Sequence, residues 1–202
     1  MNLPNALTAT RIFLVPLLVV VLLTKFEGRM IVGVRKELAG AAIFGLASLT
    51  DWLDGYLARR RQQVTPLGQL MDPLADKLLT SAAFLALVQM GLAPAWMVAI
   101  IIGRELAVTA LRNRAYSRGV PMPASSLGKI KMLAQVVSIL ALILGDVYLP
   151  GFLVVGQMAL WVVVLLALVS AADYFRRFSG LPTARVTDIS VAREERSDRK
   201  AG

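Results

Sequence analysis

Long apolar runs alternate with short polar connections along most of the chain. Each run holds about twenty residues, enough for a helix to cross a bilayer core of about 30 Å. The runs lie roughly at residues 4–24, 38–58, 70–91, 93–115, 127–148 and 152–174. This pattern predicts an all-α, polytopic membrane protein with six transmembrane helices, forming one membrane domain over residues 1–178.

The charges of the connections predict how the helices are oriented. The segments "ARRRQQ", "LRNRAYSRG" and "YFRRF" follow the second, fourth and sixth runs, whereas "GLAP" and "GDVYLPG" contain neither Lys nor Arg. Because basic residues collect on the cytoplasmic side, both termini are expected in the cytoplasm. The connection "KFEGRMIVGVRKE" is an exception to this rule, because it is mildly basic although it lies on the predicted outer side. Residues 179–202 mix both charge signs and predict a disordered cytoplasmic tail.

Composition narrows the class of protein. The chain is 57% hydrophobic, with a mean hydropathy of +0.67 and a net charge of +9. Basic helix ends beside anionic lipid headgroups explain that charge, and so little of the chain lies outside the apolar runs that nucleic acid is not an expected partner. The first run carries Arg11 and lacks a small-residue cleavage site, so it predicts a retained helix rather than a signal peptide.

Cys and His are both absent. Their absence excludes disulfides, Cys–His nucleophilic catalysis and zinc sites built on these residues. A metal site in this chain needs oxygen ligands, which suit magnesium, manganese or calcium.

Polar residues within the apolar runs gather at the predicted cytoplasmic ends. Five runs contribute them: Asn5, Thr8 and Arg11; Asp51 and Asp54; Asp72 and Asp76; Arg104, Glu105, Arg112 and Arg114; Lys129 and Lys131. Residues that only reach toward headgroups would occur at both faces of the membrane. We therefore expect a cavity that opens to the cytoplasm.

Four aspartates stand out in this set. Asp51 and Asp54 are three positions apart and Asp72 and Asp76 are four apart, so each pair lies on one helix face. The short connection "RRQQVTPLG" predicts an antiparallel hairpin that brings the two pairs together. Two unit charges about 4 Å apart repel by roughly 4 kcal/mol at an effective dielectric constant near 20, so the cluster needs protons, divalent cations or nearby arginines. The arginines of "ARRR", residues 59–61, are the alternative to metal ions.

Residues 51–76 match the pattern D-x2-D-G-x2-A-R-x8-G-x3-D-x3-D at every fixed position. This is the signature of the CDP-alcohol phosphatidyltransferase family, which the chain therefore resembles. The opening "MNLPNALTATRIFLVPLL" and the block "GRELAVTALRNRA…SSLGKIKMLAQ" resemble the bacterial phosphatidylglycerophosphate synthases of that family. Met132 departs from the Thr expected in "GKxKT".

The resemblance implies transfer of a phosphatidyl group from CDP-diacylglycerol to sn-glycerol 3-phosphate, at the cytoplasmic face of the inner (cytoplasmic) membrane, by a homodimer among membrane lipids. It implies two Mg²⁺ or Mn²⁺ ions on the four aspartates, with Asp76 also acting as the base. It assigns the cytidine diphosphate site to Gly55, Ala58, Arg59 and Gly68, to which we add Asn5 and Thr8 for CDP-diacylglycerol.

The acceptor site is less defined. A dianionic acceptor needs fixed positive charge, for which the candidates are Lys129, Lys131, Arg104, Arg112 and Arg114. Lysines at helix ends also reach toward headgroups without binding substrate, and Arg104 can pair with Glu105. Inositol phosphate, serine or phosphatidylglycerol are alternative acceptors. A cation transporter is the alternative from another class, although such sites usually lie near the midplane of repeated halves, and no repeat is visible here.

Overall fold

The computed structural model describes the backbone of residues 3–24, 30–31, 34–61, 66–117, 126–146 and 150–179. Within these ranges it describes the side chains of residues 10–24, 34–50, 74–115, 128, 130–146 and 151–176. The predicted tail lies outside the described residues, apart from residue 179 itself.

The described residues form six helices and one short hairpin. The helices are α1 (Leu3–Leu23), α2 (Lys36–Arg61), α3 (Pro66–Gln89), α4 (Ala95–Ser117), α5 (Ser126–Gly145) and α6 (Pro150–Ser179), and the antiparallel strands are β1 (Met30–Ile31) and β2 (Val34–Arg35). The prediction of an all-α fold with six helices is confirmed at this level. The helix ends were less accurate, since α3 begins four residues before its apolar run and α6 ends five residues after its own. The hairpin was not predicted.

Local sequence explains where several helices begin and end. α3 and α6 each begin at a proline, which suits the first helical position because its missing N–H would have no partner there. After α3, Gly91 adopts a φ of 77°, which favours glycine. The Gly91 N–H donates to Val88 O at 3.0 Å and the Leu92 N–H to Leu87 O at 2.9 Å. This Schellman motif ends α3 and turns the chain into α4.

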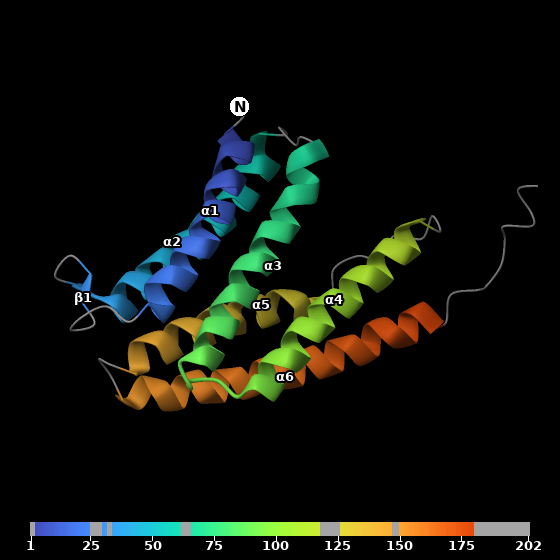
Figure 1. Ribbon diagram of the computed structural model, residues 1–202. Helices are drawn as coiled ribbons and strands as arrows, with labels where there is room; N and C mark the ends of the chain where they lie inside the picture. The colour runs from blue at the N-terminus through green and yellow to red at the C-terminus, as the bar shows by residue number, and fades with distance from the viewer. Residues whose placement is uncertain are drawn as a thin grey trace, which may run out of the picture.

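The helices lie in two groups that diverge from one end of the molecule (Figure 1). In the first group, α1 packs along both α2 and α3, and α3 runs opposite to α2, as the predicted hairpin requires. α3 nevertheless packs chiefly against α1 rather than α2. In the second group, α6 packs along α4 and α5. The start of α1, the end of α2 and the start of α3 lie together at one tip (Figure 1).

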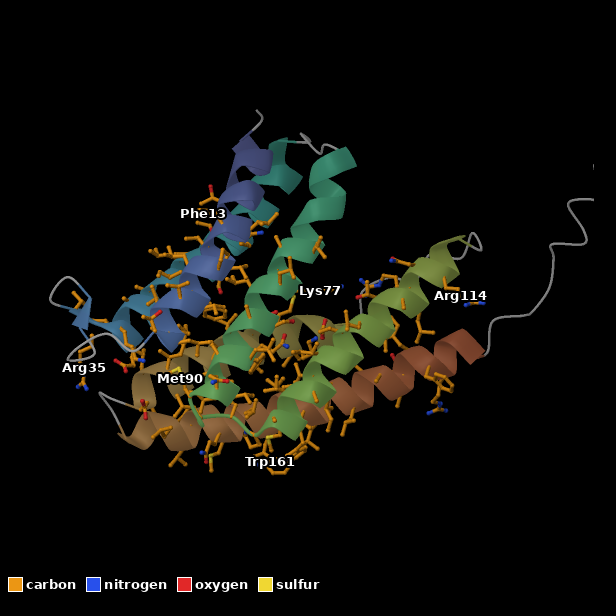
Figure 2. The ribbon with its side chains drawn as sticks, in the orientation of Figure 1. Phe13, Arg35, Lys77, Met90, Arg114 and Trp161 are labelled. Atoms are coloured by element: carbon orange, nitrogen blue, oxygen red, sulfur yellow. The ribbon has the colours of Figure 1, made fainter. Side chains whose placement is uncertain are left out.

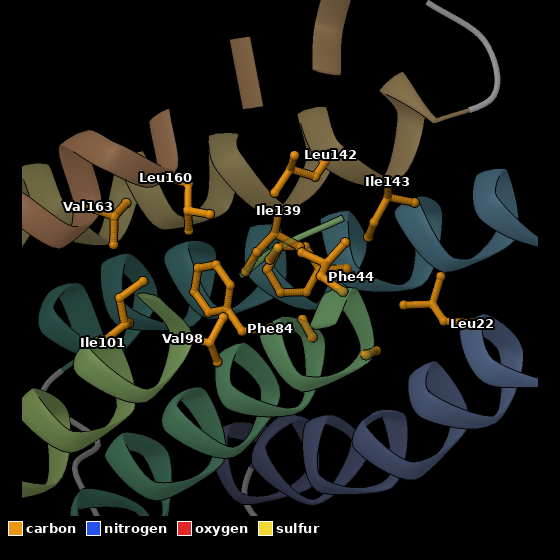
Figure 3. Close-up of a cluster of buried hydrophobic side chains, with 14 of the residues drawn as sticks. Leu22, Phe44, Phe84, Val98, Ile101, Ile139, Leu142, Ile143, Leu160 and Val163 are labelled. Carbon is orange, nitrogen blue, oxygen red and sulfur yellow. The ribbon is translucent and has the colours of Figure 1, made fainter. Parts of the chain in front are cut away.

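One hydrophobic core joins the two groups. All six helices contribute side chains to it, among them Leu22, Phe44, Phe84, Val98, Ile101, Ile139, Leu142 and Leu160 (Figure 3). The core lies near the end at which the groups converge. The charged residues precede the core positions in α3 and α5 and follow them in α4, so in all three helices they lie on the side away from that end. The position of the core holds the helices together while leaving the other ends apart.

Close contact between α5 and α6 depends on a glycine. A Cβ on Gly156 would lie 2.9 Å from the backbone nitrogen of Leu142, closer than real Cβ atoms come. Ser138 Oγ donates to the carbonyl oxygen of the same glycine at 3.0 Å. Small residues and such hydroxyl contacts allow helix backbones to approach closely within membranes.

One helix among the described residues is long and apolar enough to cross a membrane by length and composition alone. It spans Gly151–Arg176, and its most apolar 18-residue window has a mean hydropathy of 2.7 and is 28% buried inside the structure. Its exposed side chains are largely apolar, and Trp161 lies on the outer surface of the bundle (Figure 2). An exposed apolar face of this kind suits contact with lipid.

Candidate active site

The backbone of α2 and α3 is helical through all four aspartates. Asp51 and Asp54 therefore lie about one turn apart on α2, and Asp72 and Asp76 about one turn apart on α3. The side chain of Asp76, which is half-buried, is the one that the structure describes. The other three lie outside the described side chains, so their meeting with Asp76 stays a prediction.

Most of the predicted CDP-diacylglycerol site also falls outside the described side chains. This applies to Asn5, Thr8, Gly55, Ala58, Arg59 and Gly68, and to Lys129 of the predicted acceptor site. The predicted roles of these residues are untested by the geometry.

Beside α3, a cluster of charged residues joins α4, α5 and α6. Glu105 of α4 lies at its centre, because its Oε1 accepts a hydrogen bond from Arg104 Nη1 at 2.9 Å and pairs with Lys131 Nζ of α5. Arg104 also donates through Nε, at 3.0 Å, and through Nη2 to Ser170 Oγ of α6. The side chains of Arg104 and Lys131 are only 8% and 4% exposed. Lys131 thus lies inside the bundle rather than reaching out to a headgroup.

α3 joins this cluster through the residue that follows Asp76. Lys77 Nζ donates a hydrogen bond to Thr109 Oγ1 of α4, and Thr109 Oγ1 donates to the backbone oxygen of Glu105 at 2.6 Å. Figure 2 shows Lys77 between α3 and α4. A chain of two hydrogen bonds therefore connects α3 with the turn of α4 that carries Glu105.

Asp76 takes part in the electrostatics of the same cluster. Its negative charge acts on the ammonium groups of both Lys77 and Lys131, and the positive charge of Arg104 also acts on both. The candidate base and the buried cations thus belong to one site, to which α3, α4, α5 and α6 contribute. This arrangement agrees with the predicted gathering of polar residues from separate helices.

The remaining predicted acceptor residues lie further along α4. Arg112 Nη2 donates to Tyr174 Oη of α6 at 2.8 Å, and its guanidinium carbon lies 5.6 Å from the centroid of that ring. Arg114 lies in the last turn of α4, exposed and away from Lys77 (Figure 2). Arg112 lies near enough to Lys77 for their charges to interact.

Sequence reasoning missed four residues of this site: Lys77, Thr109, Ser170 and Tyr174. Lys77 follows the fourth aspartate in "DPLADKLL", and a charged residue at this place in an apolar run could have indicated a role in the site. Ser170 is a small polar residue inside the apolar run of α6. Neither position carried a spacing pattern that would distinguish a site residue from an ordinary polar residue in a helix.

The four aspartates carry carboxylate oxygens, which are donor atoms that suit a divalent metal ion. No three acidic, His or Cys residues gather among the described side chains. The chain nevertheless offers Asp76 and three further carboxylates on consecutive antiparallel helices, without nitrogen or sulfur ligands. Magnesium and manganese favour such oxygen donors.

The fold and site define an all-helical protein in which an acid-bearing helix pair lies beside a buried, mostly cationic cluster. The sequence profile of the family described as CDP-alcohol phosphatidyltransferase matches residues 1–179. The chain belongs to this family, as its aspartate signature indicated.

Relatives with established names match along most of their length. The CDP-diacylglycerol–glycerol-3-phosphate 3-phosphatidyltransferase of Bacillus subtilis is 48% identical over 184 residues, covering 87% of this chain and 94% of the relative. The protein of the same name from Rickettsia typhi is 36% identical, covering 87% and 96%. A probable phosphatidylglycerophosphate synthase of Mycobacterium tuberculosis is 37% identical, covering 87% and 81%.

Proposed function

We propose that this protein transfers the phosphatidyl group of CDP-diacylglycerol to sn-glycerol 3-phosphate, giving phosphatidylglycerophosphate and CMP. The observation that carries the proposal is the near full-length similarity to relatives named for this reaction, at up to 48% identity. The family's complete aspartate signature on α2 and α3 supports it.

The reaction needs three events at one place. The primary hydroxyl of glycerol 3-phosphate loses its proton to the carboxylate of Asp76, and its oxygen forms a bond to the phosphorus that bears diacylglycerol. The bond from that phosphorus to the oxygen bridging to CMP breaks, and CMP leaves with the electron pair. A positioned carboxylate acting as general base contributes about 10²–10⁴-fold to such a step.

Asp51, Asp54, Asp72 and Asp76 would hold the two divalent ions. When bound, such ions neutralise the diphosphate and the charge that develops on the leaving CMP. The chain's own contribution would be to hold the four carboxylates on neighbouring turns of α2 and α3, of which Asp76 acts on the cations of α3 and α5.

The charges of the described cluster favour a phosphorylated acceptor. Arg104 and Lys131 supply two buried positive charges, and Glu105 supplies one negative charge among them. This trio carries one excess positive charge, which the phosphate of an acceptor would offset. Serine would leave this excess uncompensated. Glycerol 3-phosphate and inositol phosphate fit better, and the named relatives favour the former.

We further propose that all six helices cross the inner (cytoplasmic) membrane, with both termini and the active site facing the cytoplasm, and that the protein is a homodimer. Every second helix, α2, α4 and α6, ends in basic residues. These three ends would lie on the same side of a membrane, which the positive-inside rule makes the cytoplasmic side. The four aspartates lie in the halves of α2 and α3 nearest the basic end of α2, from which a water-soluble acceptor and CMP would have access.

The direct test uses the purified full-length protein in detergent micelles with CDP-diacylglycerol, Mg²⁺ and radiolabelled glycerol 3-phosphate. The expected result is equimolar release of CMP and formation of a labelled lipid with a phosphomonoester headgroup. Parallel reactions with inositol phosphate, serine and phosphatidylglycerol test the other acceptors. Turnover with one of these and none with glycerol 3-phosphate would contradict the proposed acceptor while retaining the reaction class.

A further inference from the structure

Lys77 forms a hydrogen bond between α3 and α4 that the packing of these helices does not by itself require. It lies half-buried on α3 and reaches across to Thr109 of α4, rather than to lipid headgroups or water. Among the described side chains, Lys77 donates its hydrogen bond to the neutral hydroxyl of Thr109, while the carboxylate of Asp76 also acts on its charge. The contact therefore calls for an explanation in terms of position.

The hydroxyl of Thr109 is directional. Its proton is donated to the backbone oxygen of Glu105 at 2.6 Å, so its lone pairs are what remain for Lys77. The acceptor for Lys77 is thus fixed to the backbone of α4 itself and does not depend on a flexible side chain. The turn of α4 that carries it also carries Glu105, to which Lys131 is bound.

A fixed contact at residue 77 also fixes residue 76. Successive residues of an α-helix are rotated by about 100° around the axis, so holding one side chain sets the direction of its neighbour. α3 lies chiefly against α1, and its contacts with α4 are few. The Lys77–Thr109 bond is therefore well placed to control rotation of α3 relative to the cluster.

We propose that Lys77 and Thr109 form a positioning pair that sets the rotation of α3 and thereby places the Asp76 carboxylate against the cationic cluster. The pair touches no reacting atom and acts through Asp76. This inference rests on the proposed function, because it concerns the base of that reaction. A displacement of about 1 Å at a reacting group can lower the rate by roughly a hundredfold, so loss of the pair should appear in kcat.

The test compares Thr109→Val, Lys77→Met and the double variant as full-length proteins in micelles, with each substrate varied separately. Each single variant should lower kcat by about ten- to a hundredfold while both KM values stay within about threefold. The double variant should be no worse than the poorer single variant, because both changes remove the same bond. Thr109→Ser and Lys77→Arg should each restore most of the lost kcat, since they retain the acceptor and the donor.

Ser138→Ala is the matched control for losing a buried hydroxyl. Ser138 bonds a backbone oxygen between α5 and α6 and lies about two helical turns along α5 from Lys131, so this change should lower the thermal midpoint without changing kcat per folded molecule. If the Thr109 and Lys77 variants behave like Ser138→Ala, the pair is only structural and the inference fails. A raised KM for one substrate in Lys77→Met alone would make Lys77 a binding residue and also overturn it. An inactive wild-type protein would instead overturn the proposed function.

Discussion

Glu105 joins the buried cations of α4 and α5, so Glu105→Gln tests how far the stability of the helix bundle depends on one negative charge. Its Oε1 accepts from Arg104 Nη1 at 2.9 Å and also pairs with Lys131. Glutamine has nearly the same size and keeps a carbonyl oxygen, so the substitution removes the charge and little else.

The expected loss in the free energy of unfolding follows from the repulsion between Arg104 and Lys131, which the substitution leaves without their shared carboxylate. Groups bound to the same oxygen lie about 6 Å apart or less, where two unit charges repel by roughly 3 kcal/mol at an effective dielectric constant near 20. The low exposure of Arg104 and Lys131 limits screening by water and salt. Removing one partner of a buried ion pair costs about 3–5 kcal/mol, so we expect Glu105→Gln to lower the free energy of unfolding by that amount.

Reversible unfolding in mixed micelles, titrated with a denaturing detergent and followed by circular dichroism, measures this change. Adding Lys131→Met to Glu105→Gln removes one of the two repelling cations and should recover about 1–3 kcal/mol. Asp146→Asn is the control, because it neutralises an exposed carboxylate at the end of α5 and should change stability by less than about 0.5 kcal/mol. A loss below about 1 kcal/mol for Glu105→Gln, or a double variant less stable than the single, would refute the reasoning.

Three further predictions concern catalysis. Asp76→Asn should lower kcat by at least about 10²-fold in a protein that still folds, and near-normal turnover would rule out Asp76 as the base. Exhaustive chelation should abolish activity, which Mg²⁺ or Mn²⁺ should restore; full activity of the metal-free protein would exclude the two-metal proposal. Lys131→Gln should raise the KM for glycerol 3-phosphate by about ten- to a hundredfold and change the KM for CDP-diacylglycerol little, as steady-state kinetics will show. An unchanged acceptor KM would move the acceptor site toward Arg112 and Arg114.

Predicting the helices from the sequence succeeded where apolar residues carried the signal. The errors lie at the polar ends of helices, where hydropathy does not register a helix. The segment "PLGQ" opens α3 and "RRFS" closes α6, although neither belongs to an apolar run. Backbone hydrogen bonding continues a helix beyond the membrane core regardless of side-chain polarity, so such ends are misjudged by a few residues.

The candidate site was also predictable only in its local part. The aspartate signature could be recognised because its members lie within one hairpin at fixed spacing, which helix geometry converts directly into shared faces. Lys77 bonds a residue 32 positions away and Arg104 one that is 66 positions away. Contacts over such separations depend on how each helix is rotated and packed, and no local pattern records this.

The sequence by itself determined the helical class of this protein, its family and the aspartate signature by which that family is recognised. Those features follow from residue type and local spacing, which an α-helix translates into position without reference to other helices. Only the tertiary structure decided that Lys131 is buried against Glu105, that Ser170 holds Arg104, and that Lys77 joins α3 to α4. The physical reason is that the cost of burying a charge depends on which partner the folded chain brings within a few ångströms, and packing of the whole bundle selects that partner.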